Sequence, residues 1–180
     1  MKRLVLFVVL LMCLLFPVGS PQAAPGGARV VRDTIEHYFQ LLKTGRYEKI
    51  YDLLPASTRS LSSRQDFASG LSRLAGLLRF EKIEIGRIDQ KGTLAVAATT
   101  VYGTLSQPIT LNDRVISRGR ILSQHYLVKE NGSWKVASVN EQTLRLFLKE
   151  HPSAGTLFPQ YTTRFELLSE GQWVRMPGSR

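Results

Sequence analysis

Apolar side chains recur with a helical period in the segment that follows residue 29. The positions that share one face are Val31, Ile35, Tyr38, Phe39 and Leu42. Because these residues are spaced mainly by three and four, the pattern predicts a helix over residues 30–44 with one side packed against a core. Gly45 ends this helix, since glycine readily takes the left-handed conformation of a C-terminal cap.

Two further helices are predicted before the pattern changes. Residues 47–54 read as a short second helix, which Pro55 ends. Ser63 stands three residues before Asp66, a variant of the capping box in which aspartate replaces the usual glutamate, and this predicts the start of a third helix. Its apolar stripe consists of Phe67, Leu71, Leu74, Ala75 and Leu78. The segment 57–62 is a polar connection.

At Phe80 the period of apolar residues shortens, and isoleucines alternate with charged residues as they do in half-buried strands. The predicted strands cover residues 80–88, 93–102, 115–129 and 134–139. The Asn131-Gly132 pair predicts a tight hairpin turn, because both residue types tolerate positive φ. Gly119 predicts a bulge in the longest of these strands.

A second helical pattern follows Asn140 and ends at Pro152. Beyond Tyr161, two short runs with apolar and aromatic residues flank residues 169–172, which predicts a small hairpin. Residues 140–180 are therefore expected to be a C-terminal extension made of a helix and a hairpin.

The N-terminus has the layout of a secretory signal peptide. A basic start precedes an unbroken apolar run over residues 4–16, and small residues follow up to Ala24. Thirteen apolar residues are too few for a bilayer core, which takes roughly 20. We therefore expect a signal over residues 1–24, a linker over 25–29 and a periplasmic or extracellular mature protein. An uncleaved anchor and lipidation at Cys13 are the alternatives.

Composition limits the chemistry of the mature chain. Cys13 is the only cysteine and leaves with the signal, so no disulfide or thiol nucleophile is expected. The full chain has 24 basic and 14 acidic residues, a net charge of +10. This charge favours contact with anionic envelope surfaces. The basic residues are dispersed and not interleaved with aromatics, so nucleic-acid binding is not expected.

Helices followed by a run of antiparallel strands predict an α+β fold. The order is more specific, because residues 42–47 (LKTGRY) link two helices and residues 131–136 (NGSWKV) close the strand meander. This arrangement resembles exported bacterial members of the nuclear transport factor 2-like, or cystatin-like, superfamily. The resemblance covers residues 30–139. It implies a curved antiparallel sheet around a long helix, with a cone-shaped pocket between them.

The resemblance leaves catalysis open, since the superfamily includes enzymes, binding modules and transport adaptors. Its isomerases and dehydratases place acids, histidines or tyrosines inside the cone. The strands predicted over 93–102 and 134–139 carry no carboxylate and no histidine. Acid–base catalysis needs a titratable group in a pocket, so the sequence favours a non-catalytic role. No cofactor and no metal are expected.

Three side chains are candidates for the polar part of a ligand pocket: Tyr38, Tyr102 and His125. Each has a structural alternative, because tyrosine and histidine are also common as hydrogen-bonded core residues. A second group, Arg114, Arg118 and Arg120, shares one face of a regular strand and is a candidate for binding an anion. The alternative is a charged strand that resists edge-to-edge pairing.

Together these patterns predict an exported binding or interaction domain of the cell envelope. Its expected partner is a small apolar or anionic ligand or an envelope protein, and a homodimer is compatible with the sequence. Two alternatives stay open. One is a small-molecule isomerase or dehydratase acting in the cone, which needs a buried acid–base group. The other is an envelope subunit that uses the basic strand and the extension, which needs an exposed apolar patch.

Overall fold

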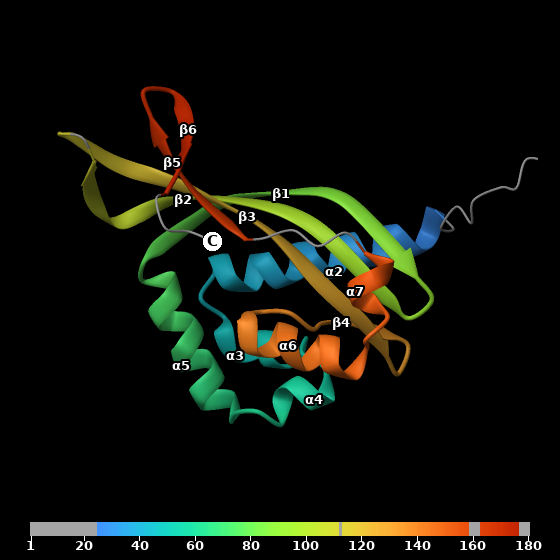
Figure 1. The fold of residues 1–180 in the computed structure, drawn as a ribbon. Coiled ribbons are helices and arrows are strands. Elements are labelled where there is room, and N and C mark those ends of the chain that lie inside the picture. Colours follow the sequence, from blue (N-terminus) through green and yellow to red (C-terminus); the bar gives the residue numbers. More distant parts are fainter. Residues whose placement is uncertain (1–24, 112, 159–162, 177–180) are drawn as a thin grey trace, which may run out of the picture.

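Figure 1 shows the fold as a computed structural model, which describes residues 25–111, 113–158 and 163–176. The signal peptide predicted over residues 1–24 lies outside the described residues. Within the described part of the chain, no helix is both long enough and apolar enough to cross a membrane.

The N-terminal half begins with helices. They are α2 (Pro25–Lys43), α3 (Tyr47–Tyr51), α4 (Ala56–Arg59) and α5 (Arg64–Ala75). The first helix, predicted from residue 30, begins earlier, at Pro25, a residue suited to the first helical turn, and so includes the residues 25–29 that were expected to form a linker. Gly45 ends α2 with φ of 69°. The Ser63 hydroxyl accepts a hydrogen bond from the backbone of Asp66 at 3.1 Å, which confirms the cap of α5.

The helix predicted over residues 47–54 is shorter in the structure, and the segment after it is not simply a polar connection. Helix α3 ends at Tyr51, and a separate turn of helix, α4, follows Pro55. The Tyr51 hydroxyl donates to the carbonyls of Arg59 and Ser62, at 2.7 and 3.0 Å. These hydrogen bonds hold the connection against α3.

The remaining chain builds a six-stranded antiparallel sheet, so the predicted α+β class is confirmed. The strands are β1 (Leu78–Lys91), β2 (Leu94–Leu111), β3 (Arg114–Glu130), β4 (Ser133–Val136), β5 (Arg164–Ser169) and β6 (Gln172–Arg175). The sheet order is β1-β2-β3-β5-β6, and β4 also pairs with β3. The hairpin turn at Asn131-Gly132 is confirmed, with φ of 47° and 80°.

Strand β3 is the central strand of the sheet. One of its edges pairs with β2, while β4 and β5 share the other edge (Figure 1). Strand β4 pairs with the last residues of β3, and β5 pairs with residues 119–122. The C-terminal hairpin is thereby part of the same sheet as the earlier strands.

The bulge predicted at Gly119 is wrong. Gly119 pairs in regular register with Gly103 on β2 and with Leu167 on β5. The irregularity of this pairing lies between Thr104 and Ile109. A Cβ on Gly119 would lie 2.9 Å from the ring of Phe165, so the glycine provides room for an aromatic ring.

Each face of the sheet carries a separate apolar core. Side chains of α2 pack against one face, and those of α6 (Glu141–Glu150) and α7 (Ala154–Leu157) pack against the other (Figure 1). The first core includes Val31, Ile35, Tyr38, Ala95, Ala97, Leu127, Trp134 and Val136. The second includes Leu94, Val96, Tyr126, Val128, Phe147 and Phe158. Adjacent residues of β2 therefore serve opposite cores, as strand geometry requires.

The C-terminal extension contains the predicted helix and hairpin. Asn140 caps α6 by accepting from the backbone of Thr143 at 2.9 Å. Phe158 is 2 % exposed in the second core, and Trp173 packs against the ring of Tyr102. These aromatic residues are therefore used in internal packing and do not form the exposed apolar patch that an envelope subunit would need.

Candidate functional site

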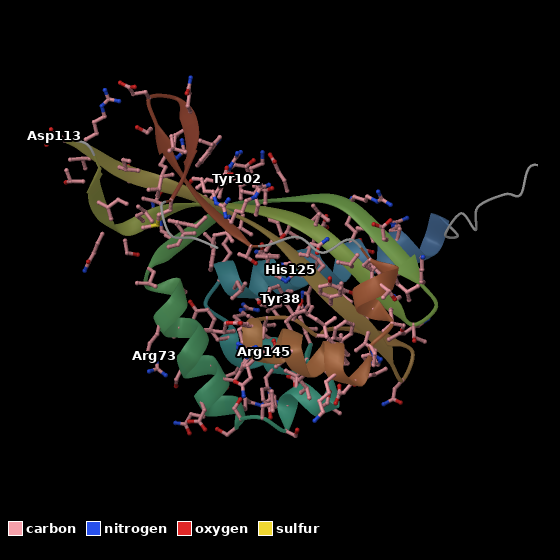
Figure 2. The ribbon with its side chains drawn as sticks, in the orientation of Figure 1. Tyr38, Arg73, Tyr102, Asp113, His125 and Arg145 are labelled. Atoms are coloured by element: carbon pink, nitrogen blue, oxygen red, sulfur yellow. The ribbon has the colours of Figure 1, made fainter. Side chains whose placement is uncertain are left out.

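The space between α2 and the sheet is filled by side chains. His125 on β3 points toward α2, as Figure 2 shows, and is 9 % exposed. The centre of its ring lies 5.9 Å from that of Tyr38 and 5.4 Å from that of Phe39. The structure thus brings together two of the three predicted pocket residues, but it places them in a packed core.

Burial controls the ionisation of this pair. Burial lowers the pKa of His125 to about 4, and the nearby backbone of Ser138 opposes the shift only in part. Nε2 lies 3.3 Å from the Ser123 hydroxyl, while Nδ1 makes no hydrogen bond of normal geometry with a described residue. Burial also raises the pKa of Tyr38 above its ordinary value. Both side chains are neutral near pH 7 and lack the solvent access that proton exchange with a substrate needs.

A small groove lies at the rim of this core, between α2 and β1. Its volume is about 330 Å³, and Phe39 and Phe80 are among its lining residues. Lys43 spans the two elements by donating to the carbonyl of Glu81 at 2.9 Å. None of the three predicted pocket residues lines this groove.

On the opposite face of the sheet, one row of side chains crosses from β1 to β6. The cross-strand neighbours in this row are Lys82, Tyr102, Arg120, Glu166 and Arg175. Directly paired residues of an antiparallel sheet point to the same face, so the row is continuous. We call it the cross-sheet row.

Tyr102, the third predicted pocket residue, belongs to the cross-sheet row and is therefore separated from His125 by the thickness of the sheet. Its hydroxyl donates to the Glu84 carboxylate at 2.8 Å. The centre of its ring lies 5.7 Å from that of Trp173. The Arg120 guanidinium lies over the same Trp173 ring, 4.5 Å from its centre. Tyr102 thus helps attach the C-terminal hairpin to the sheet.

The three arginines predicted to bind an anion each have a carboxylate partner. The pairs are Arg114–Glu170 at 2.6 Å, Arg118–Glu81 at 3.6 Å and Arg120–Glu166 at 2.6 Å. The Arg120 and Glu166 side chains are only 22 % and 12 % exposed, so their charges are well shielded from solvent. These pairs neutralise the strand locally and leave it less suited to capture an anion.

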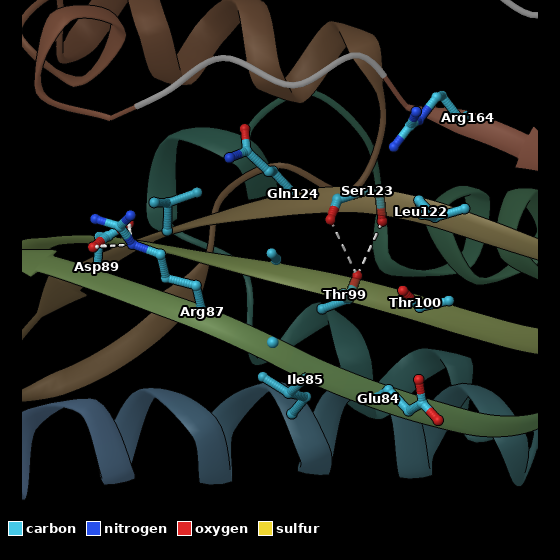
Figure 3. Close-up of a pocket in the computed structure, with 13 residues that line it drawn as sticks. Glu84, Ile85, Arg87, Asp89, Thr99, Thr100, Leu122, Ser123, Gln124 and Arg164 are labelled. Carbon is cyan, nitrogen blue, oxygen red and sulfur yellow. Dashed lines mark hydrogen bonds and ion pairs between the residues drawn. The ribbon is translucent and has the colours of Figure 1, made fainter.

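A larger hollow lies beside the cross-sheet row on the same face, with a volume of about 540 Å³ (Figure 3). Strands β1, β2, β3 and β5 supply its lining. The floor of the hollow is low because Gly86 and Ala98 are small. A Cβ added to Gly86 would contact only Ala98, through its Cβ at 3.8 Å and its carbonyl oxygen. Volumes of about 300–1,000 Å³ are typical of small-molecule sites.

Glu84 stands at one side of this hollow as an ionised carboxylate. Hydrogen bonds from Lys82 and Tyr102 lower its pKa. Its two oxygens are both used, because Lys82 reaches Oε1 at 2.7 Å and Tyr102 reaches Oε2 at 2.8 Å. Glu84 is consequently a fixed negative charge in this wall, already engaged by its neighbours.

Among the described residues, Arg164 is the lining cation that makes no ion pair. The other lining arginine, Arg87, is paired with Asp89 at 2.8 Å. Arg164 extends from β5 at the edge of the hollow, as Figure 3 shows. The Thr100 hydroxyl on the floor makes no hydrogen bond with a described residue. The hollow therefore offers one guanidinium and one hydroxyl to a ligand, above an apolar floor that includes Leu122.

Sequence reasoning missed this hollow. Arg164 belongs to the segment predicted as a hairpin, but its pairing with Leu122 joins positions far apart in the chain. The small residues Gly86 and Ala98 are the available sequence signal for a low floor, and they indicate it only once β1 and β2 are placed side by side.

In the described part of the chain, no group of three or more histidine, cysteine, aspartate or glutamate side chains is arranged to hold a metal ion. Comparison of the sequence with models of known protein families finds no match, and comparison with curated proteins finds none either.

Proposed function

We propose that this chain is an exported, non-catalytic binding domain whose small ligand lies in the hollow beside the cross-sheet row. The observation that carries the proposal is the unpaired Arg164 beside a floor of small and apolar residues. Four strands of one sheet supply the lining, so the site is formed before a ligand arrives.

A binding role is favoured over the isomerase or dehydratase alternative by the state of the titratable groups. His125 is neutral and packed against aromatic rings. Glu84 has its pKa lowered and both oxygens occupied, which makes it a poor proton acceptor at neutral pH. A general base needs a pKa closer to the working pH and access to the substrate.

We also propose that the fold is a nuclear transport factor 2-like one, in which side chains fill the cone. The order of four helical segments followed by a meander supports this, as does the position of α2 against the sheet. Export is supported by the layout of residues 1–24. Intact-mass measurement of the full chain made in a bacterial host tests export: a periplasmic product lacking about 24 residues is expected, and an uncut cytoplasmic product contradicts it.

Native mass spectrometry of the protein purified gently from the host envelope tests the binding proposal. We expect a co-purifying small molecule that is lost in an Ala98→Leu variant, because the larger side chain fills the floor of the hollow. Ala56→Leu is the matched control, since it adds the same side chain at an exposed position on α4. A wild-type protein that carries no small molecule, or a ligand retained by Ala98→Leu, contradicts the proposal.

A further inference from the structure

Resting on the proposed function, we infer that the ligand of the hollow is a singly charged carboxylate with an apolar body. The inference comes from the number and placement of charges around the hollow and from the chemistry of its floor. Arg164 binds the carboxylate, Thr100 donates a second hydrogen bond, and the apolar body lies over Ala98 and Val96.

The two donors stand in one row of the sheet. Glu84, Thr100, Leu122 and Arg164 are successive cross-strand neighbours, so their side chains share a face. Thr100 and Arg164 are two strands apart, which places their backbones about 10 Å from one another. A carboxylate held above Leu122 lies within reach of both, because the arginine side chain is long and the planar guanidinium binds carboxylates through two hydrogen bonds.

The charges of the walls favour one negative charge over two. Arg164 is the unpaired cation among the described lining residues, while Glu84 and Asp89 are carboxylates of the same hollow. Lys82 and Arg87 are already paired with these acids, so the second negative charge of a phosphate or a polyanion would find no unpaired cation among the described lining residues. A neutral ligand would leave the guanidinium without the partner that it can bind most strongly.

The floor explains the apolar body. Val96, Ala98 and Leu122 line the hollow and offer no hydrogen-bonding side chains. The volume of the hollow, about 540 Å³, is much larger than a carboxylate group alone, so the rest of the hollow must cover apolar atoms. Burial of each methylene group there adds to the affinity.

Isothermal titration calorimetry of the mature protein, which lacks the signal over residues 1–24, tests the inference at pH 8 with four probes. Octanoate has one charge and an apolar chain, octyl phosphate has two charges, 1-octanol has none, and acetate lacks the chain. We expect octanoate to bind at least tenfold more tightly than each of the others, because octyl phosphate carries a surplus charge, 1-octanol lacks the charge and acetate lacks the apolar chain.

Variants locate the interaction. Arg164→Gln is expected to weaken octanoate binding about ten- to a hundredfold, the strength of a hydrogen bond between charged groups. Thr100→Val removes a hydroxyl at nearly constant volume and is expected to weaken it about three- to tenfold. Arg145→Gln is the matched control, since Arg145 pairs with Glu141 on the solvent side of α6, outside the hollow. Circular dichroism of each variant verifies its fold.

The outcomes separate this inference from the proposed function. Equal or tighter binding of octyl phosphate or octanol, or an Arg164→Gln variant with wild-type affinity, overturns the ligand class. If Ala98→Leu still abolishes binding in that case, the hollow stands as a binding site. Failure of octanoate to bind also overturns the class, and the co-purification experiment then decides separately whether the hollow binds another ligand.

Discussion

Protonation of His125 would place a positive charge in the core, beside the rings of Tyr38 and Phe39. Desolvation disfavours the charged form of a buried histidine, and this is the main cause of its lowered pKa. The residue therefore serves the core as a neutral polar side chain. Its sequence position on the inner face was predictable, but the closeness of the packing was not.

The folded protein should lose stability in mild acid because of His125. Its pKa is about 4 in the fold against an ordinary value of 6.5, so the unfolded chain binds a proton first as pH falls. Stability from this residue is full above pH 6.5 and falls as the pH approaches 4, by up to about 1.4 kcal/mol per pH unit and ~3 kcal/mol in all. Urea unfolding at a series of pH values measures the slope.

The His125→Gln variant isolates this contribution. We expect its free energy of unfolding to vary less between pH 6.5 and 4 than that of the wild type, since glutamine does not titrate there. His37→Gln is the control, because His37 lies on the exposed side of α2 and should leave the slope unchanged. A His125→Gln slope equal to the wild-type slope would show that other groups cause the acid sensitivity.

At the scale of elements, two facing glycines let strands and side chains approach closely in the middle of the sheet. Gly103 on β2 pairs with Gly119 on β3. A Cβ on Gly103 would lie 2.5 Å from the backbone carbonyl of Arg79 on β1. Because that neighbour is backbone, the approach of β1 to β2 depends on the absence of a side chain at Gly103.

Gly103→Ala is therefore expected to destabilise the protein by about 1–3 kcal/mol, the usual cost of overpacking. Gly70→Ala is the matched control, since a Cβ there meets nothing within 4 Å. Alanine at that helical position should instead stabilise by about 0.5–1 kcal/mol. Chemical denaturation of both variants gives the two values, and equal stability of the pair would refute the close-packing argument.

Local patterns were sufficient for most elements. The cap at Ser63, the turn at Asn131-Gly132 and the helix after Asn140 each depend on residues a few positions apart, and all three are confirmed. The prediction of a bulge at Gly119 is wrong because a glycine within a strand indicates either a bulge or a close neighbour. The neighbour is Phe165, whose position depends on a distant strand pairing.

The candidate site was less predictable for the same reason. Arg164 lies opposite Leu122 only because β5 returns to the edge of β3 that β4 leaves uncovered. Tyr102 and His125 were assigned to one pocket although their positions on neighbouring strands place them on opposite faces. Once the register is known, the alternation of strand residues resolves this error.

At the scale of the molecule, both cores depend on the same strands, so they should unfold together. Trp134 belongs to the core under α2, and Trp173 lies in the C-terminal hairpin. These are the two tryptophans of the chain. The variants Trp134→Phe and Trp173→Phe each leave one fluorescent reporter, and we expect both to give the same fraction unfolded as circular dichroism of the same variant.

Different behaviour of the two reporters would divide the molecule into separate units. If the signal of Trp173 changed at lower urea than the circular dichroism of that variant, the hairpin would be a local unit that detaches from β3. Coincident transitions at each reporter would mean that the hairpin and the helical core share one cooperative structure.

The sharing of one edge of β3 by two strands affects the order of assembly during synthesis. Strand β4 follows β3 directly, whereas β5 adds to the same edge only after α6 and α7 have emerged. Until then, the chain has the floor residues Ala98 and Leu122 but lacks the wall that Arg164 supplies. If the proposed function holds, an unfinished or truncated chain lacks the guanidinium that binds the ligand, and occupancy of the hollow becomes a sign that β5 has docked.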